Sequence, residues 1–219
     1  MKLIECVPNF SEGRRQEVMD AIVNGMKESA NVIILDVEAD PSHNRMVVTM
    51  VGEPQQVLNA MKSGARKAVE LIDLNQHQGE HPRIGALDVV PFVPLFNVTM
   101  GECNELALEF GQWMWDELKV PVYLYAESAR MPERKRLPNI RKGEFEGLRE
   151  AIKEPERHPD IGEPVIHPTA GATAVGARNF LIAFNLYLNT ADKGVADKIA
   201  KAVRESSGGL VNIQAKGMF

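Results

Sequence analysis

The order of apolar patterns along residues 1–95 most constrains what this 219-residue chain can fold into. Four short apolar or β-branched runs predict strands, at residues 2–8, 32–37, 46–51 and 89–95. Between them, residues 16–29 and 55–72 place apolar side chains at helical spacing. The order is strand, helix, strand, strand, helix, strand, which is the split βαβ arrangement. We therefore expect an α/β fold (α+β-like) with a mixed sheet and helices on one face.

The middle of the chain extends this pattern and then interrupts it. Thr99 with Glu102 three residues later forms a capping-box signal for the start of a third helix, and residues 122–125 predict a further strand. Residues 127–168 contain many prolines and show little periodicity, apart from a short helix predicted at residues 144–153. A stretch of this length is typical of a connector or a functional loop.

The last part of the chain predicts a second unit that is only begun. Residues 180–188, 191–205 and 210–215 have the patterns of a strand, a helix and a strand. They would open a second unit of the first kind, whose remaining elements are missing. We therefore expect one domain at residues 1–178 and, at residues 179–219, the beginning of a similar, apparently truncated subdomain that a partner or a longer chain completes.

Composition excludes several classes of function. The chain carries 25 Lys and Arg against 30 Asp and Glu, a net charge of −5, whereas proteins that bind a phosphate backbone are usually basic. No apolar run approaches the roughly 20 residues that span a membrane, and the N-terminal apolar run is too short for a signal peptide. Cys6 and Cys103 match no metal or disulfide spacing. We expect a cytoplasmic protein without nucleic-acid or membrane partners.

Topology predicts where polar side chains gather. In a split βαβ unit, three loops emerge at one end of the sheet, and here they are residues 9–13, 38–44 and 73–87. These loops and the edge of the hairpin contain most of the chain's histidines and several other polar residues: Asn9, Glu12, His43, Asn44, Arg45, His77, Glu80, His81 and Arg83. An ionisable cluster at this end is therefore expected.

Residues 77–83 (HQGEHPR) have three interpretations. His77 and His81 have the spacing of a helical zinc pair, but Gly79 and Pro82 disfavour a helix and no third ligand is evident. A turn with solvated histidines is the commonest outcome for such a string. One histidine beside Glu80 could also exchange a proton near neutral pH. Residue types alone leave the three open.

Two further segments allow a binding or a structural interpretation. In residues 171–178 (GATAVGAR), small residues would let the backbone approach a flat ligand and Arg178 could meet a carboxylate, but spacing alone favours a tight turn into a strand. The basic residues at 130–141 could grip a polyanion, but a solvated face is the favoured interpretation.

Four motifs together carry a family resemblance. They are residues 5–13 (ECVPNFSEG), 79–88 (GEHPRIGALD), 120–125 (VPVYLY) and 171–178 (GATAVGAR). In this order they resemble the formiminotransferase domain, over nearly the whole chain. The resemblance covers the N-terminal subdomain and the start of the C-terminal one. It implies two similar α/β subdomains stacked sheet to sheet with the ligands between them, and a homodimer.

The resemblance also implies an activity in one-carbon metabolism and histidine degradation. A transferase would move the formimino group of N-formimino-L-glutamate to N5 of tetrahydrofolate, giving 5-formiminotetrahydrofolate and glutamate. Tetrahydrofolate is then a co-substrate, and no metal is expected. Two alternatives remain open: a 5-formyltetrahydrofolate:glutamate formyltransferase, and a folate-binding fragment that is inactive without the rest of the second subdomain. A zinc hydrolase is a third alternative.

The resemblance finally assigns site residues. The histidine of the GEHPR motif, here His81, is the family's acid/base. Folate lies along a segment that corresponds here to Gly162, Glu163, Pro164, Val165, Ile166, His167, Pro168, Thr169, Ala170 and Gly171. Animal members carry Trp where this chain has Ala170, so aromatic stacking on the pterin is not expected there. From charge and loop position we add a set of expected substrate-binding residues: Asn9, Asn44, Arg45, Arg83 and Arg178.

Overall fold

A computed structural model describes residues 1–182, 184 and 186–218 of the chain. They form two compact units, Met1–Phe180 and Leu181–Phe219. The first unit opens with β1 (Leu3–Cys6), β2 (Asn9–Phe10), α1 (Gln16–Ser29), β3 (Val32–Asp40), β4 (Arg45–Gly52), α2 (Pro54–Leu71) and β5 (Leu87–Phe96). This order confirms the split βαβ prediction. It differs at residues 9 and 10, which pair with β4 and β5 as strand β2 instead of starting a loop.

The first unit continues with α3 (Met100–Leu118), β6 (Val122–Ala126), η1 (Pro132–Lys135), α4 (Leu137–Ile140), α5 (Glu144–Ala151), η2 (Pro155–Arg157) and β7 (Thr173–Ala177). The capping box of α3 is confirmed. The Thr99 side chain accepts a hydrogen bond from the Glu102 backbone N–H, and the Glu102 carboxylate accepts the Thr99 backbone N–H at 2.7 Å. The short helix predicted within the long connector is α5.

The described strands form one seven-stranded sheet. β1 and β2 lie in its middle, antiparallel to β4 on one side and to β5 on the other, and β3 pairs antiparallel with β4. Beyond β5, strands β7 and β6 extend the sheet in parallel. The sheet is therefore mixed, as expected for this α/β fold.

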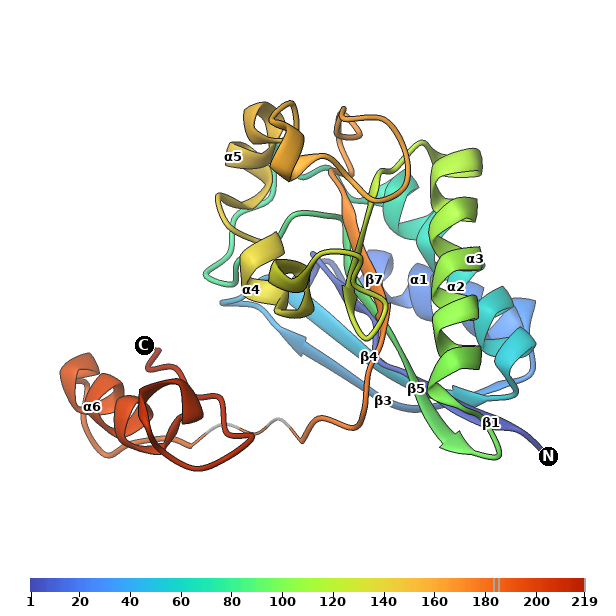
Figure 1. Ribbon diagram of the computed structural model, residues 1–219. Helices are drawn as coiled ribbons and strands as arrows, with labels where there is room; N and C mark the ends of the chain where they lie inside the picture. The colour runs from blue at the N-terminus through green and yellow to red at the C-terminus, as the bar shows by residue number, and fades with distance from the viewer. Residues whose placement is uncertain (183, 185, 219) are drawn as a thin grey trace. The chain divides into compact units, whose positions relative to one another are not determined.

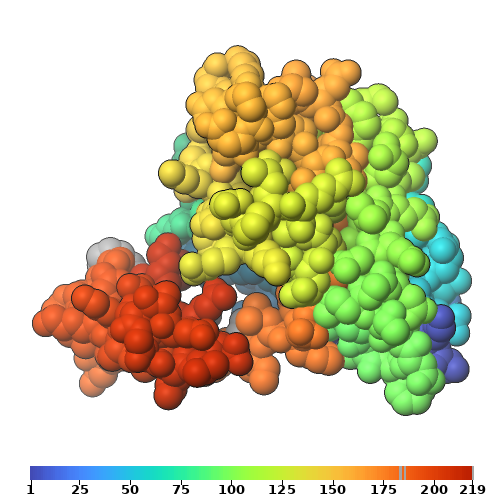
Figure 2. Space-filling model, in the orientation of Figure 1, coloured from blue at the N-terminus to red at the C-terminus, as the bar shows by residue number. Residues whose placement is uncertain are grey.

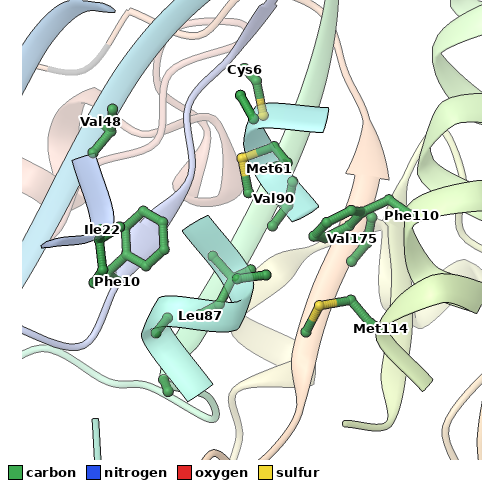
Figure 3. Close-up of a cluster of buried hydrophobic side chains, with 14 of the residues drawn as sticks. Cys6, Phe10, Ile22, Val48, Met61, Leu87, Val90, Phe110, Met114 and Val175 are labelled. Carbon is green, nitrogen blue, oxygen red and sulfur yellow. The ribbon is translucent and has the colours of Figure 1, made fainter. Parts of the chain in front are cut away.

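The main core lies between the sheet and the helices α1, α2 and α3 (Figure 1). Fully buried side chains from both layers meet there, among them Phe10 of β2, Met61 of α2 and Phe110 of α3 (Figure 3). The rings of Phe92 and Phe110 pack edge to face, with centroids 6.1 Å apart. Burial of such side chains stabilises a fold by about 1.5–3 kcal/mol each.

The opposite face of the sheet is covered near β6 and β7 by the segment between them. Along β6 the side chains alternate, so that Leu124 joins the main core and Tyr123 a smaller cluster with Ile140 of α4 and Leu148 of α5. The expectation of helices on one face therefore holds for α1, α2 and α3, while Ile140, Leu148 and Ile152 from the segment between β6 and β7 pack on the other. In the space-filling view this segment, yellow to orange, forms a continuous surface beside the green α3 (Figure 2).

The prediction of a turn at residues 171–178 is wrong, because most of this segment is strand β7 itself, between β5 and β6. Small residues make this position possible: a Cβ on Gly176 would lie 2.2 Å from the Tyr125 carbonyl oxygen. Alanine and glycine have low strand propensity, so the pattern did not indicate a strand. Close packing between two neighbouring strands overrides that propensity.

The second unit contains α6 (Lys193–Val203) and η3 (Glu205–Ser207), and α6 confirms the helix predicted there. The strand predicted at 210–215 is wrong, since these residues form a turn with one bridge to Arg204. The strand predicted at 180–188 includes residues 183 and 185, which lie outside the described residues, and the described ones are not strand. A strand requires a neighbour's backbone groups, which apolar patterning does not supply.

No helix within residues 1–182, 184 and 186–218 is long and apolar enough to cross a membrane.

Candidate active site

Three loops meet at one end of the sheet, as the topology predicts. Asn44 joins them: its side-chain oxygen accepts the Gly13 backbone N–H, and its amide nitrogen donates to the Gln78 carbonyl, both at 3.0 Å. The Glu80 backbone N–H also donates to the Ser42 carbonyl at 3.2 Å. Asn44 adopts a left-handed backbone with φ 48° to make this junction. The polar residues predicted to gather at this end therefore come from loops that are hydrogen-bonded to one another.

His81 lies in this junction, with its ring next to that of His43. Its ring centroid is 5.8 Å from that of His43. Within the described part of the chain, neither ring nitrogen of His81 makes a hydrogen bond to a protein group. The ring borders a cavity of about 10 Å³, which is room for roughly one water molecule. The cavity is lined by Asn9, Phe10, Ser11, His43, Arg45, His81, Arg83 and Asp88. It is a notch beside the imidazole and too small for a folate.

The surroundings of His81 favour its neutral form. Burial, followed by the charges of Arg45 and Arg141, lowers its pKa to about 4, while Asp88 acts in the opposite direction. A histidine with such a pKa is unprotonated at neutral pH and can accept a proton. The site therefore presents a base.

Arg45 is the cation beside His81 that has a neutral partner. Its guanidinium donates from Nε to the side-chain oxygen of Asn9 at 2.8 Å and also from Nη2. Asn9 in turn donates to the Val7 carbonyl, which orients its amide. Among the described residues no carboxylate lies within 4 Å of the Arg45 guanidinium. Its positive charge is therefore available to an anionic group at this end of the sheet.

Asp88 and Arg141 form an ion pair next to the histidine loop. One oxygen of Asp88 accepts the Ile84 backbone N–H at 2.7 Å, and the other accepts Nε of Arg141 at 2.8 Å and also Nη2. The sequence reasoning missed both residues as members of the site. The available signal was a carboxylate in the apolar run that begins at Leu87.

The interpretation of residues 130–141 as a solvated face is wrong for two of its arginines. The Arg134 side chain is 9% exposed and donates to Asp160 at 2.7 Å, and that of Arg141 is 12% exposed. Arg130 and Arg136 are exposed, as expected. The difference arises because buried carboxylates from distant parts of the chain pair with two members of the run.

Arg83 is buried and surrounded by acceptors. Its Nε donates to Nδ1 of His77 at 3.1 Å, and its terminal nitrogens donate to Glu144 at 2.9 Å and to both oxygens of Glu146 at 2.7 and 2.6 Å. His77 Nε2 lies 2.8 Å from the Asn44 carbonyl oxygen. Both ring nitrogens of His77 are thus occupied, in contrast to those of His81. This arrangement does not favour the zinc interpretation, and among the described residues no three His, Cys, Asp or Glu side chains gather as a metal site would require.

Residues 167–171, the second half of the expected folate segment, lie against the histidine loop. The Ala86 N–H donates to the Ala170 carbonyl, and the Leu74 N–H to the Thr169 carbonyl, both at 2.9 Å. His167 stabilises this turn because its Nδ1 accepts the Ala170 N–H at 3.0 Å. Ala170 is 1% exposed, so its side chain has no surface to offer a ligand. Residues 162–166 are mostly exposed, including Val165.

Arg178 is not brought into this cluster. It follows the far end of β7, where its backbone N–H donates to the Phe92 carbonyl. Gly171, at the near end of the same segment, pairs with Gly85.

Comparison with known proteins identifies the family. Residues 3–178 match the formiminotransferase domain, N-terminal subdomain. The chain belongs to the formiminotransferase domain family. The family resemblance of its four motifs is thereby confirmed.

Relatives of this formiminotransferase chain come from distant organisms. It is 51% identical over 208 residues to the formimidoyltransferase-cyclodeaminase of Rattus norvegicus. The matched region covers 95% of this chain and 38% of the rat protein. It is 46% identical over 218 residues to a glutamate formimidoyltransferase of Streptococcus pyogenes serotype M1, and 47% identical over 221 residues to one of Thermoplasma acidophilum. Both matches cover 100% of this chain and 73% of the relative. The chain therefore spans less than half of the rat relative and about three quarters of the two microbial ones.

Proposed function

We propose that this protein is a transferase that moves a formimino group from N-formimino-L-glutamate to N5 of tetrahydrofolate, with His81 as the acid/base. One observation carries the assignment of the base. Of the histidines in the converging loops, His77 has both ring nitrogens bound to protein groups and His43 has Nδ1 3.4 Å from an oxygen of Asp40, whereas the ring nitrogens of His81 have no partner among the described residues. The names of the streptococcal and archaeal relatives, glutamate formimidoyltransferase, support the same reaction.

The chemistry requires one proton to leave and one to arrive. N5 of tetrahydrofolate forms a bond to the formimino carbon and gives its proton to His81. The bond between that carbon and the glutamate nitrogen then breaks, and the nitrogen takes the proton back from His81. An imidazole with a pKa of about 4 starts neutral, and once protonated it is a strong acid toward the leaving nitrogen. Such catalysis contributes about 10²–10⁴-fold, so positioning of the two substrates must supply much of the rest.

Arg45 is the best-supported of the expected carboxylate ligands. It is close enough to His81 to lower that residue's pKa, and its own partner is the neutral amide of Asn9. A carboxylate of glutamate would give the Arg45 guanidinium the two-point contact it lacks. The proposed roles of Asn44 and Arg83 have less support, since both side chains already bind protein groups. Arg178 would have to act at a different part of the ligand.

The folate is proposed to lie along residues 162–171. This placement is supported by the backbone hydrogen bonds that hold residues 167–171 against the loop of His81. Exposed Val165 offers an apolar contact, whereas Ala170 is buried and its backbone N–H and carbonyl are bound to His167 and Ala86. The pterin would therefore contact other residues of this segment, and it would meet no aromatic ring at position 170.

Further parts of the proposal concern the whole protein. Residues 179–219 are proposed as the beginning of the second subdomain, and the protein as a cytoplasmic homodimer. It would use tetrahydrofolate as co-substrate without a metal, and bind neither nucleic acid nor membranes. The acidic net charge of −5 supports the absence of a nucleic-acid partner.

A turnover assay with matched histidine variants tests the proposal. The wild-type chain, His81→Ala and His43→Ala are compared with tetrahydrofolate and N-formimino-L-glutamate, and in parallel with 5-formyltetrahydrofolate and glutamate. We expect formimino transfer that falls by at least about 10²-fold in His81→Ala and much less in His43→Ala. Transfer that survives in His81→Ala but not in His43→Ala would show that His43, and not His81, is the base. If only the formyl donor is turned over, the reaction is formyl transfer and the proposed formimino transfer is wrong.

A further inference from the structure

We propose that His77 is a positioning residue for His81: in its neutral Nε2–H tautomer it pins together the two ends of the loop that carries His81. The proposal rests on the proposed function of His81. It concerns a residue that does not touch the reacting atoms and acts through Arg83 and Asn44.

The position of His77 and Arg83 along the chain makes this closure possible. His77 lies four residues before His81 and Arg83 two residues after it. The Nε–H of Arg83 donates to Nδ1 of His77 at 3.1 Å, and Nη2 of Arg83 also reaches the His77 carbonyl oxygen at 3.4 Å. Arg83 thus joins the two ends of the loop, and His81 lies near the tip of the loop.

The bridge is anchored on both sides. Arg83 is 7% exposed and is held by Glu144 and by both oxygens of Glu146 at the start of α5. On the other side, the ring of His77 contacts the carbonyl oxygen of Asn44, the residue that joins the hairpin loop to the rest of the site. The ring of His77 therefore links Arg83 on one side to Asn44 on the other.

Hydrogen-bond chemistry fixes the state of the ring. An arginine can only donate, so Nδ1 of His77 must be the acceptor. A carbonyl oxygen can only accept, so Nε2 must carry the proton. Both contacts are satisfied in the neutral Nε2–H tautomer alone. A second proton would turn Nδ1 into a donor facing the guanidinium of Arg83 and place two positive charges in contact.

The charged groups around His77 act in both directions. Burial is the largest cause and lowers its pKa below the ordinary value; the hydrogen bond to the Asn44 carbonyl raises it, and Arg83 and Arg14 lower it further. Glu12, from the loop before α1, raises it. Glu144 and Glu146 of α5 pair with Arg83 and balance its charge. The ring is thus expected to be neutral near pH 7, and acidification is expected to open the loop.

Two variants separate the two contacts. His77→Asn keeps an oxygen near the place of Nδ1, able to accept from Arg83, whereas His77→Gln keeps an amide near the place of Nε2, able to donate to Asn44. We expect His77→Asn to retain kcat within about tenfold. For His77→Gln we expect a fall in kcat on the order of 10²-fold with little change in KM, because displacement of a catalytic group by about 1 Å has that effect. His158→Gln, in the connector far along the chain, is the control and is expected to behave as wild type.

Nitrogen NMR of the imidazoles tests the proposal without any turnover. In the full chain we expect His77 to show the Nε2–H tautomer at pH 7, and its protonation on acidification to shift the ring signals of His81 at the same midpoint. In His77→Asn that step in the His81 signals should be absent. The fall of kcat on acidification should then depend on one proton fewer than in the wild type.

The outcomes distinguish this proposal from the proposed function. A His77 ring that is protonated or in the Nδ1–H form at pH 7, or His81 signals that ignore the titration of His77, would overturn the positioning role whatever the turnover. Equal kcat in wild type and His77→Gln would overturn it as well. If instead the NMR coupling is observed but no formimino transfer occurs, the positioning of His81 stands and the proposed function fails.

Discussion

Gly79 lies where the loop of His81 touches the hairpin loop, and the contact leaves no room for a side chain. A Cβ added there would be 2.2 Å from the carbonyl oxygen of His43, 2.8 Å from its carbonyl carbon and 3.0 Å from Cβ of Asn44. Two of these atoms are backbone, so they cannot rotate away. The φ of Gly79 is not in the left-handed region. Gly79→Ala therefore probes steric contact between the two loops and not backbone strain.

The size of the effect follows from the required displacement. Carbon contacts at van der Waals distance are about 3.5–4.0 Å, so the two loops must separate by roughly 1 Å. Overpacking of this kind costs about 1–3 kcal/mol of unfolding free energy. The same displacement of His81 relative to its surroundings is expected to lower turnover on the order of 10²-fold.

Urea unfolding and turnover of Gly79→Ala measure the two effects, and Gly147→Ala is the matched control. Gly147 lies within α5, and a Cβ there meets nothing within 4 Å. Its replacement by alanine should stabilise the chain by about 0.5–1 kcal/mol. Faster hydrogen exchange at the Glu80 N–H, which donates to Ser42, should accompany Gly79→Ala. If Gly79→Ala unfolds like wild type and turns over normally, the two loops do not meet as described.

Three further predictions concern charge and burial. The pKa of His81 is about 4 in the folded chain, below the ordinary histidine value of 6.5, so on acidification the unfolded chain binds a proton at this histidine first. Lowering the pH from 6.5 to 4 should therefore lower the unfolding free energy by up to about 3 kcal/mol. Urea titrations of His81→Asn should lack that part of the loss. Arg45→Met should raise KM for the glutamate-bearing substrate by tenfold or more, with Arg45→Lys in between; an unchanged KM would remove Arg45 from the substrate site. Asp160→Asn should lower the unfolding free energy by about 3–5 kcal/mol because it leaves the buried charge of Arg134 without its partner. Lys67→Met, at an exposed pair with Glu70, should change it by less than about 1 kcal/mol. Similar losses in the two variants would refute the burial argument.

The sequence by itself determined most helices and strands of residues 1–126 and where the loops meet. The helix predicted at residues 16–29 has the observed bounds of α1, and the capping box at Thr99 and Glu102 is formed. These features depend on spacing within a few residues, which a local pattern records. The convergence of the three loops follows from the order of the elements alone. The assignment of His81 as the base came from the family motif and stays a prediction.

The tertiary structure decided which charges are free and which are occupied. Arg83 and Arg45 are equally basic in the sequence, yet Arg83 is bound by Glu146, 63 residues away, while Arg45 faces the neutral Asn9. Arg141 pairs with Asp88 across 53 residues. Strand β7, with its small residues, likewise depends on the two strands beside it. Such contacts join residues that no local pattern links, and the partner a buried charge finds there determines whether it holds the fold or remains available to a ligand.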